Sequence, residues 1–145
     1  MELTIGLRGR PLDKIGMEKD SRTIAVIDDD GGIREALRRM LNIAGFRVQT
    51  FECAESFLAA LPACEAACAV VDVNLGPGSC GLDLARHPAM SAARLPLIFI
   101  SGSADESLRE RALTLGCIEY LRKPFMPIEL LDAVFRATQD PSPIP

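Results

Sequence analysis

The chain has 145 residues, of which 48% are hydrophobic and 25% are charged, a size and composition typical of one globular domain. The net charge of −4 and the lack of a basic run argue against nucleic-acid binding, because phosphate-backbone contacts need clustered lysine and arginine. No apolar segment approaches the length of a membrane span, so we expect no membrane partner either.

The two ends of the chain differ from its middle. Residues 1–21 mix glycines with scattered charges and show no period, so we expect a flexible N-terminal extension. The natural start is either Met1 or Met17, and the sequence leaves both open. We assign residues 22–138 to one domain and expect the proline-rich tail, residues 139–145, to be disordered.

The first half of the domain alternates between strand and helix patterns. "TIAVID" (23–28) predicts a strand, and apolar residues at helical spacing from Ile33 to Ala44 predict a helix that ends at Gly45. "RVQTF" (47–51) alternates like a strand, and "AESFLAAL" (54–61) predicts a short helix that stops at Pro62. The apolar run "CAVVDV" (68–73) is typical of a strand that is buried on both faces.

The second half continues this alternation. After the loop "NLGPGSCG" (74–81) we predict a short helix from Leu82 that Pro88 terminates, and then a buried strand, "LPLIFIS" (95–101). The remaining predicted elements are a helix over 104–115 with Gly116 beyond its end, a strand over 118–121 and a helix over 127–138 that Pro127 opens. Five strand–helix repeats with short connections predict a doubly wound α/β domain, with a five-stranded parallel sheet and helices on both faces.

Polar side chains follow the predicted strands at the points where they end. Asp28 and Asp29 end the first strand, Asp72 the third, Ser101 the fourth and Lys123 the fifth. Because ligands of open parallel sheets bind at the carboxyl ends of the strands, we expect these side chains to converge. Clustered carboxylates suit Mg²⁺, which would also offset the repulsion within the aspartate run. A lysine and a hydroxyl suit a phosphoryl group, and an aspartate can form an acyl phosphate.

The cysteines and the single histidine suggest no further chemistry. The five cysteines form no CxxC pair, and His87 has no histidine partner, so a zinc site or a catalytic triad has little support. We expect free thiols in a reducing compartment, and therefore a cytoplasmic protein.

Four motifs carry a resemblance to a known family. "VIDDD", "VVDVNL", "FISG" and "YLRKPF" resemble, in order and spacing, the receiver domain of two-component response regulators of the chemotaxis-regulator type. The resemblance covers about residues 22–138 and implies a flavodoxin-like (βα)5 fold. It implies that Asp72 is the phosphorylated aspartate, that Ser101 and Lys123 act on the phosphoryl group, and that Mg²⁺ is held by Asp28, Asp29, Asp72 and the backbone carbonyl of Asn74.

The same resemblance implies a switch and a set of partners. Ser101 and Tyr120 match the hydroxyl and the aromatic that rearrange on phosphorylation, and the Lys123–Pro124 peptide bond is implied to be cis. The phosphoryl donor would be a sensor histidine kinase or a histidine phosphotransfer protein. A downstream protein, or a second copy in a homodimer, would dock on the helix 104–115, the strand 118–121 and the helix 127–138. Such a protein is a switch and not an enzyme, because it catalyses only its own phosphorylation and slow autodephosphorylation.

Two features depart from the family pattern. Gly31 and Gly32 begin the first helix poorly, since glycine costs about 1 kcal/mol relative to alanine inside a helix. The loop "LGPGSCG" is one residue longer than the commonest form. Asp30 has no family role, and we predict that it caps the first helix or places a charge in its first turn.

Two other readings remain open at this point. Asp28-x-Asp30 is reminiscent of haloacid-dehalogenase phosphatases, which phosphorylate an aspartate after the first strand, so the position of the phosphoryl group would separate the two classes. A degenerate receiver that serves only for docking is the other alternative. No helix-turn-helix pattern follows Thr138, so we expect that this chain does not read DNA, whether it is a stand-alone receiver or a fragment of a longer regulator.

Overall fold

The computed structural model describes residues 22–139, and the predicted N-terminal extension and residues 140–145 of the predicted tail lie outside this range. Five strands form one parallel sheet in the order β2-β1-β3-β4-β5. They are β1 (Thr23–Ile27), β2 (Arg47–Phe51), β3 (Ala66–Asp72), β4 (Leu97–Ser101) and β5 (Glu119–Arg122). The strand order reverses direction between β1 and β3, and sheets of this kind bind their ligands at that switch point.

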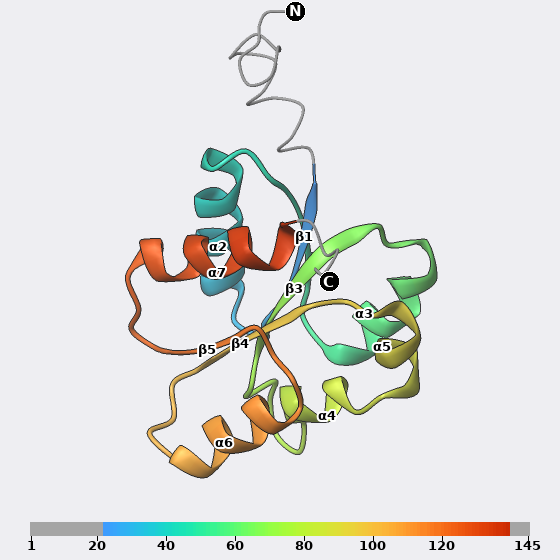
Figure 1. Ribbon diagram of the computed structural model, residues 1–145, viewed down its shortest axis with the longest axis vertical. Helices are drawn as coiled ribbons and strands as arrows, with labels where there is room; N and C mark the ends of the chain where they lie inside the picture. Colours follow the sequence, from blue (N-terminus) through green and yellow to red (C-terminus); the bar gives the residue numbers. More distant parts are fainter. Residues whose placement is uncertain (1–21, 140–145) are drawn as a thin grey trace, which may run out of the picture.

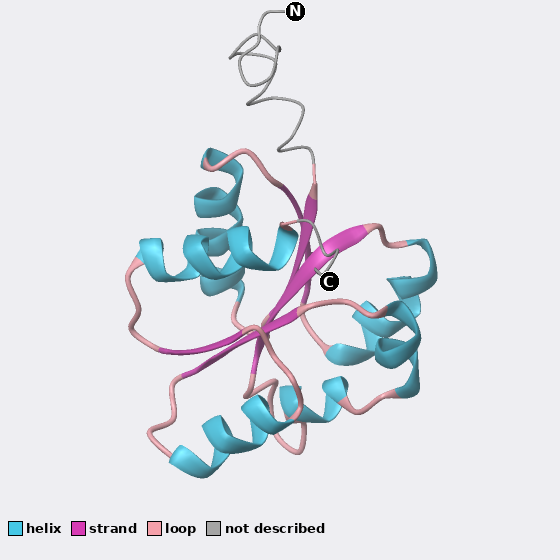
Figure 2. Cartoon of the chain, viewed as in Figure 1, coloured by secondary structure: helices cyan, strands magenta, loops and turns pink. Residues whose placement is uncertain are grey.

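Helices cover both faces of the sheet, which confirms the predicted doubly wound α/β fold (Figures 1 and 2). One face carries α2 (Gly31–Ile43) and α7 (Pro127–Thr138). The other face carries α3 (Ala54–Ala60), α4 (Gly81–Ala85), α5 (Pro88–Ala93) and α6 (Glu106–Thr114). Within residues 22–139, the bounds of most elements lie within two residues of those that the sequence predicts.

The core consists of two apolar layers, one on each face of the sheet. Successive residues of β1 face opposite layers, so Ile24 and Val26 pack toward α2 and α7, and Ala25 and Ile27 pack toward α3. These four side chains are fully buried. A strand buried on both faces needs a continuous apolar run, and this is why the sequence shows runs in place of alternation.

Two helices end before the prolines that the sequence predicts to stop them, but both prolines also belong to further helical turns that the sequence did not predict. Pro88 does not merely terminate the helix from Leu82: that helix is α4, which ends at Ala85, and Pro88 begins a further helix, α5. Proline suits the first turn of a helix because the N–H group that it lacks has no intrahelical partner there. The His87 imidazole accepts a hydrogen bond from the Ala89 N–H at 3.0 Å, which caps α5. Pro62 likewise lies within a 3-10 turn, Leu61–Ala63, that continues α3.

The beginning of β1 and the end of α7 meet at the amino edge of the sheet. The Arg22 guanidinium donates a hydrogen bond to the backbone carbonyl of Thr138, which is in the last turn of α7. The Thr138 hydroxyl donates to the carbonyl of Val134 at 2.9 Å. A cation that bonds a carbonyl at the end of a helix also interacts favourably with the helix dipole.

Candidate functional site

The end of β1 delivers two aspartates into different surroundings. Asp28 is fully buried, whereas Asp29 is exposed. The Asp28 N–H donates to the Phe51 carbonyl at 3.0 Å, which extends the pairing of β1 with β2 by one residue. One carboxylate oxygen of Asp28, Oδ1, accepts the Asp30 N–H at 2.9 Å. The turn that follows β1 is therefore built around the Asp28 side chain.

The third aspartate of the run caps α2, which confirms its prediction. Asp30 Oδ1 accepts the N–H groups of Gly32 at 2.8 Å and Ile33 at 3.1 Å. The N–H groups in the first turn of a helix have no intrahelical partners, so this cap offsets the weak start that Gly31 and Gly32 give the helix. Its bonds to the backbone of α2 keep Asp30 out of the group that the other two aspartates form.

The end of β3 delivers Asp72, which is buried with 4% of its surface exposed. Its Oδ1 accepts the Asn74 N–H at 2.9 Å, and its Oδ2 accepts a hydrogen bond from Lys123 Nζ at 3.0 Å. Gly81 passes directly behind it, where a Cβ atom would lie 2.2 Å from the Asp72 carbonyl oxygen. Both carboxylate oxygens of Asp72 are thus held from the protein side.

The long loop after β3 folds into a small closed unit. Residues Asn74 and Cys80 form an antiparallel bridge, and the Leu75 N–H donates to the Ser79 carbonyl at 3.1 Å. Gly76 has φ +109°, a left-handed conformation that a side chain disfavours. The loop is thus closed by its own hydrogen bonds, and Val73 and Asn74, next to Asp72, are hydrogen-bonded to the Ile100 carbonyl and to Asp72 Oδ1.

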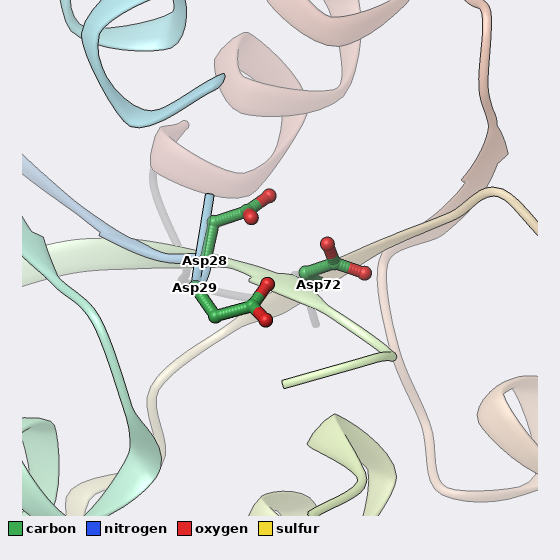
Figure 3. A group of neighbouring side chains, drawn as sticks. All are labelled: Asp28, Asp29 and Asp72. Carbon is green, nitrogen blue, oxygen red and sulfur yellow. The ribbon is translucent and has the colours of Figure 1, made fainter. Parts of the chain in front are cut away.

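The three carboxylates of Asp28, Asp29 and Asp72 converge at the switch point between β1 and β3. Each offers one oxygen atom, and these three atoms lie within 4.8 Å of one another. Figure 3 shows the carboxylates of Asp28 and Asp29 extending from the end of β1 toward the side of Asp72. Lys123 Nζ joins the group, 3.0 Å from Asp72 Oδ2 and 3.8 Å from Asp28 Oδ2. Below, these three carboxylates are called the acid cluster.

Burial makes the acid cluster electrostatically costly. The removal of Asp28 from water raises its pKa from 3.8 to about 6, and the nearby charge of Asp72 adds to the rise. The hydrogen bond from the Asp30 N–H and the charge of Lys123 act in the opposite direction. Asp28 Oδ2 is buried and has no hydrogen-bond partner among the described residues. Three converging carboxylates, one of them with a buried oxygen that lacks a hydrogen-bond partner among the described residues, are the kind of oxygen donor set that Mg²⁺ prefers, so the residues present fit this cation.

Ser101 and Tyr120 lie on the neighbouring strands β4 and β5, two residues apart in register. Tyr120 pairs with Phe99, two residues before Ser101, so both side chains project from the same face of the sheet. Ser101 is 2% exposed, and its hydroxyl oxygen accepts the Ser103 N–H at 3.0 Å. Tyr120 is 5% exposed, and its hydroxyl has no hydrogen-bond partner among residues 22–139. The Lys123–Pro124 peptide bond is cis.

One residue of the site escaped the sequence reasoning. Arg34, in the first turns of α2, donates a hydrogen bond from Nη1 to the backbone carbonyl of Asp28 at 2.7 Å. An arginine at this place in a helix is normally a solvated surface charge, so its residue type gave no signal. The spacing of six residues between Arg34 and Asp28 becomes informative only when the turn between β1 and α2 is known.

The fold and the acid cluster define a flavodoxin-like α/β domain with an acidic pocket at its switch point. The family model described as "Response regulator receiver domain" matches residues 24–135. The chain belongs to this family. Receiver domains are signalling switches of two-component systems that interact with histidine kinases and typically use Mg²⁺ at an acidic pocket. Within residues 22–139, every helix is too short or too polar to cross a membrane.

Similar proteins include regulators of transcription. The chain is 38% identical over 102 residues to the transcriptional regulatory protein FixJ of Bradyrhizobium diazoefficiens. The matched region covers 70% of this chain and 49% of FixJ. It is 36% identical over 115 residues to the transcriptional regulatory protein TdiR of Thauera aromatica. This matched region covers 79% of this chain and 50% of TdiR. The chain thus spans about half the length of these curated relatives.

Solved structures show the same architecture. The crystal structure of FixJ-N matches with a TM-score of 0.73 at 28% identity, covering 86% of this chain and 98% of that one. The response regulator StyR matches with a TM-score of 0.73 at 38% identity, covering 82% of this chain and 60% of that one.

Proposed function

We propose that the protein is a phosphoacceptor of a two-component phosphorelay and that Asp72 receives the phosphoryl group. The observation that carries this proposal is the position of Asp72, whose carboxylate lies in one cluster with those of Asp28 and Asp29 and 3.0 Å from Lys123 Nζ. In the proposed transfer a carboxylate oxygen of Asp72 attacks phosphorus, and the bond from phosphorus to the donor histidine breaks. The donor is a histidine kinase or a histidine phosphotransfer protein.

The surrounding residues have distinct roles in this proposal. Asp28, Asp29, Asp72 and the backbone carbonyl of Asn74 would hold Mg²⁺, which when bound would neutralise charge on the phosphoryl oxygens. Lys123, whose ammonium group already bonds to Asp72, would bind a phosphoryl oxygen and stabilise the acyl phosphate. Slow hydrolysis of that acyl phosphate would return the protein to its starting state. We place this chemistry in the cytoplasm, where histidine kinases present their phosphoryl groups.

The proposed output passes through Ser101 and Tyr120. A phosphoryl group on Asp72 would draw the Ser101 hydroxyl toward it, and Tyr120 would rotate into the space that is vacated. The unpartnered Tyr120 hydroxyl supports this step, because a buried hydroxyl without a partner gains from a new position. The affected surface is formed by α6, β5 and α7, where Met126 and Ile128 are 62% and 66% exposed. A downstream protein or a second copy of the chain would dock there.

Phosphorylation by a small donor tests the proposed function. With Mg²⁺ and acetyl phosphate, the protein should gain one acid-stable, base-labile phosphoryl group as acetate leaves. Asp72→Asn should abolish this labelling, whereas Asp83→Asn should not, because the Asp83 side chain is 65% exposed on α4 and lies outside the acid cluster. Undiminished labelling of Asp72→Asn would contradict the proposal, and a phosphoryl group on Asp28 would favour the haloacid-dehalogenase-like alternative.

A further inference from the structure

Among residues 22–139, one side chain from another element bonds to the backbone of Asp28. Asp28 is fully buried, so its main-chain carbonyl needs a hydrogen-bond donor within the protein. Its N–H pairs with the Phe51 carbonyl on β2, but the carbonyl itself lies beyond the last paired residue of the β1 ladder. Arg34 Nη1 supplies the donor at 2.7 Å. This is a short, charge-assisted hydrogen bond, and such bonds are about twice as strong as neutral ones.

The local sequence leaves room for this contact. Arg34 is three residues after Gly31, the first residue of α2, so its guanidinium folds back over the start of the helix. A Cβ atom on Gly31 would lie 3.4 Å from Arg34 Nη2 and 4.0 Å from Cζ, so the guanidinium passes close over the bare glycine backbone. The glycine that weakens the helix start also lets the arginine reach the end of β1.

Other arginines of α2 behave differently. Arg38 and Arg39 both form ion pairs with Glu35, at 3.2 Å and 3.3 Å, and their side chains are 46% and 75% exposed. Exposed pairs of this kind contribute little to stability. Arg34 is only partly exposed and bonds to the backbone of a residue of the acid cluster. Its contact is therefore distinct in kind from the surface ion pairs of the same helix.

We propose that Arg34 is a positioning residue for the cation site. It holds the Asp28 carbonyl, and this fixes the orientation of the peptide that joins Asp28 to Asp29. The directions in which both carboxylates leave the end of β1 follow from that orientation. Residues that orient metal ligands without touching the metal typically contribute about 10-fold or more to metal affinity. This inference rests on the proposed function, since it takes the acid cluster to be the Mg²⁺ site.

The direction in which Mg²⁺ affinity changes when the Arg34 guanidinium is removed distinguishes a positioning role from a simple effect of charge. Removing a positive charge near a cation site strengthens cation binding if charge alone matters, because a repulsive interaction is lost. Loss of positioning weakens binding, because the two carboxylates no longer converge. A purely structural role lowers the stability of the metal-free protein and leaves the Mg²⁺ affinity unchanged. The three roles thus predict three different results for one measurement.

The test compares Mg²⁺ binding by the wild-type protein and the variants Arg34→Met, Arg34→Lys and Arg38→Met. Binding is measured from amide chemical shifts of residues 28–30 during titration with MgCl₂, and thermal unfolding without Mg²⁺ shows that each variant is folded. Arg34→Met should lower the affinity about 10-fold. Arg34→Lys keeps one donor and should recover part of the loss. Arg38→Met, which removes a charge from the same helix without touching Asp28, should stay within about two-fold of the wild type.

Each result has a definite meaning. Tighter or unchanged Mg²⁺ binding by Arg34→Met would overturn the positioning role while leaving the metal site itself in place. An equal loss in Arg38→Met would also overturn it. If Arg34→Met fails to fold, Arg34→Ala, which also lacks the donor, takes its place, and unchanged or tighter Mg²⁺ binding by that variant would overturn the role in the same way. Absence of Mg²⁺ binding by the wild-type protein would instead refute the proposed site, and with it this inference.

Discussion

Replacing Asp28 by asparagine would remove a buried carboxylate from the acid cluster and keep the shape of the side chain. Burial, assisted by the charge of Asp72, raises the pKa of Asp28 from 3.8 to about 6. At about 1.36 kcal/mol per pKa unit, this difference corresponds to about 3 kcal/mol that the ionised group subtracts from the stability of the metal-free fold. Asparagine cannot ionise, so the variant should be free of this cost.

The pH dependence of the stability difference follows from the direction in which the pKa of Asp28 is shifted. The pKa of Asp28 is higher in the folded protein than in the unfolded chain, so the folded state binds the proton more tightly. Proton binding by Asp28 therefore stabilises the folded wild-type protein. This stabilisation is complete below pH 3.8 and is lost as the pH rises through about 6. Metal-free Asp28→Asn should therefore exceed the wild type by about 3 kcal/mol at pH 7.5, and the two proteins should converge near pH 4.

Urea unfolding in EDTA, followed by circular dichroism between pH 4 and pH 8, measures this difference. Asp29→Asn serves as the control, because Asp29 is exposed and its replacement should change the stability by less than about 0.5 kcal/mol. Added Mg²⁺ should stabilise the wild type more than Asp28→Asn, since a cation that binds only the folded state adds to its stability. The reasoning would be refuted if Asp28→Asn raised the free energy of unfolding equally at pH 4 and pH 7.5, or did not raise it at pH 7.5.

Three further predictions concern the residue packed behind Asp72, the cap of α2 and a buried thiol of β3. Gly81→Ala should lower the free energy of unfolding by about 1–3 kcal/mol, measured by urea unfolding, because the new methyl group would lie 2.2 Å from the Asp72 carbonyl oxygen. Asp30→Ala should cost about 1 kcal/mol in the same assay, because α2 loses its cap, and an unchanged midpoint would contradict that role. Burial raises the pKa of the Cys68 thiol to about 12, so folded protein at pH 8 should resist iodoacetamide at Cys68 and react there only after unfolding, as read by peptide mass spectrometry.

The central strands β1, β3 and β4 were predictable from the sequence because burial on both faces requires a continuous apolar run. β3 and β4 are apolar from edge to edge, and each ends in a polar side chain, Asp72 or Ser101. The convergence of these side chains then follows from the parallel arrangement alone, which brings all carboxyl ends to one edge. The cap at Asp30 was equally readable, because it needs only local geometry.

Features that depend on packing were not predictable. Asp28 and Asp29 are the same residue type and adjacent, yet one is fully buried and the other exposed. Only the helices that cover the sheet decide which of the two loses water. The sequence did not predict helix α5 for two reasons. A proline can follow the end of one helix or stand in the first turn of the next, and "PAMSAA" has one buried residue, Met90, so it shows no helical period. The bond from Arg34 to Asp28 likewise depends on the turn between two elements.

The Arg22–Thr138 contact has a consequence for how the domain can be joined to other sequences. It brings the two ends of the domain together at the amino edge of the sheet, whereas the acid cluster lies at the carboxyl edge. A strand of five residues such as β1 spans about 17 Å at about 3.3 Å per residue. A reporter joined directly at residue 22 or residue 138 would thus leave from the side opposite the acid cluster. A short linker between the ends would permit circular permutation, with new termini in an exposed loop.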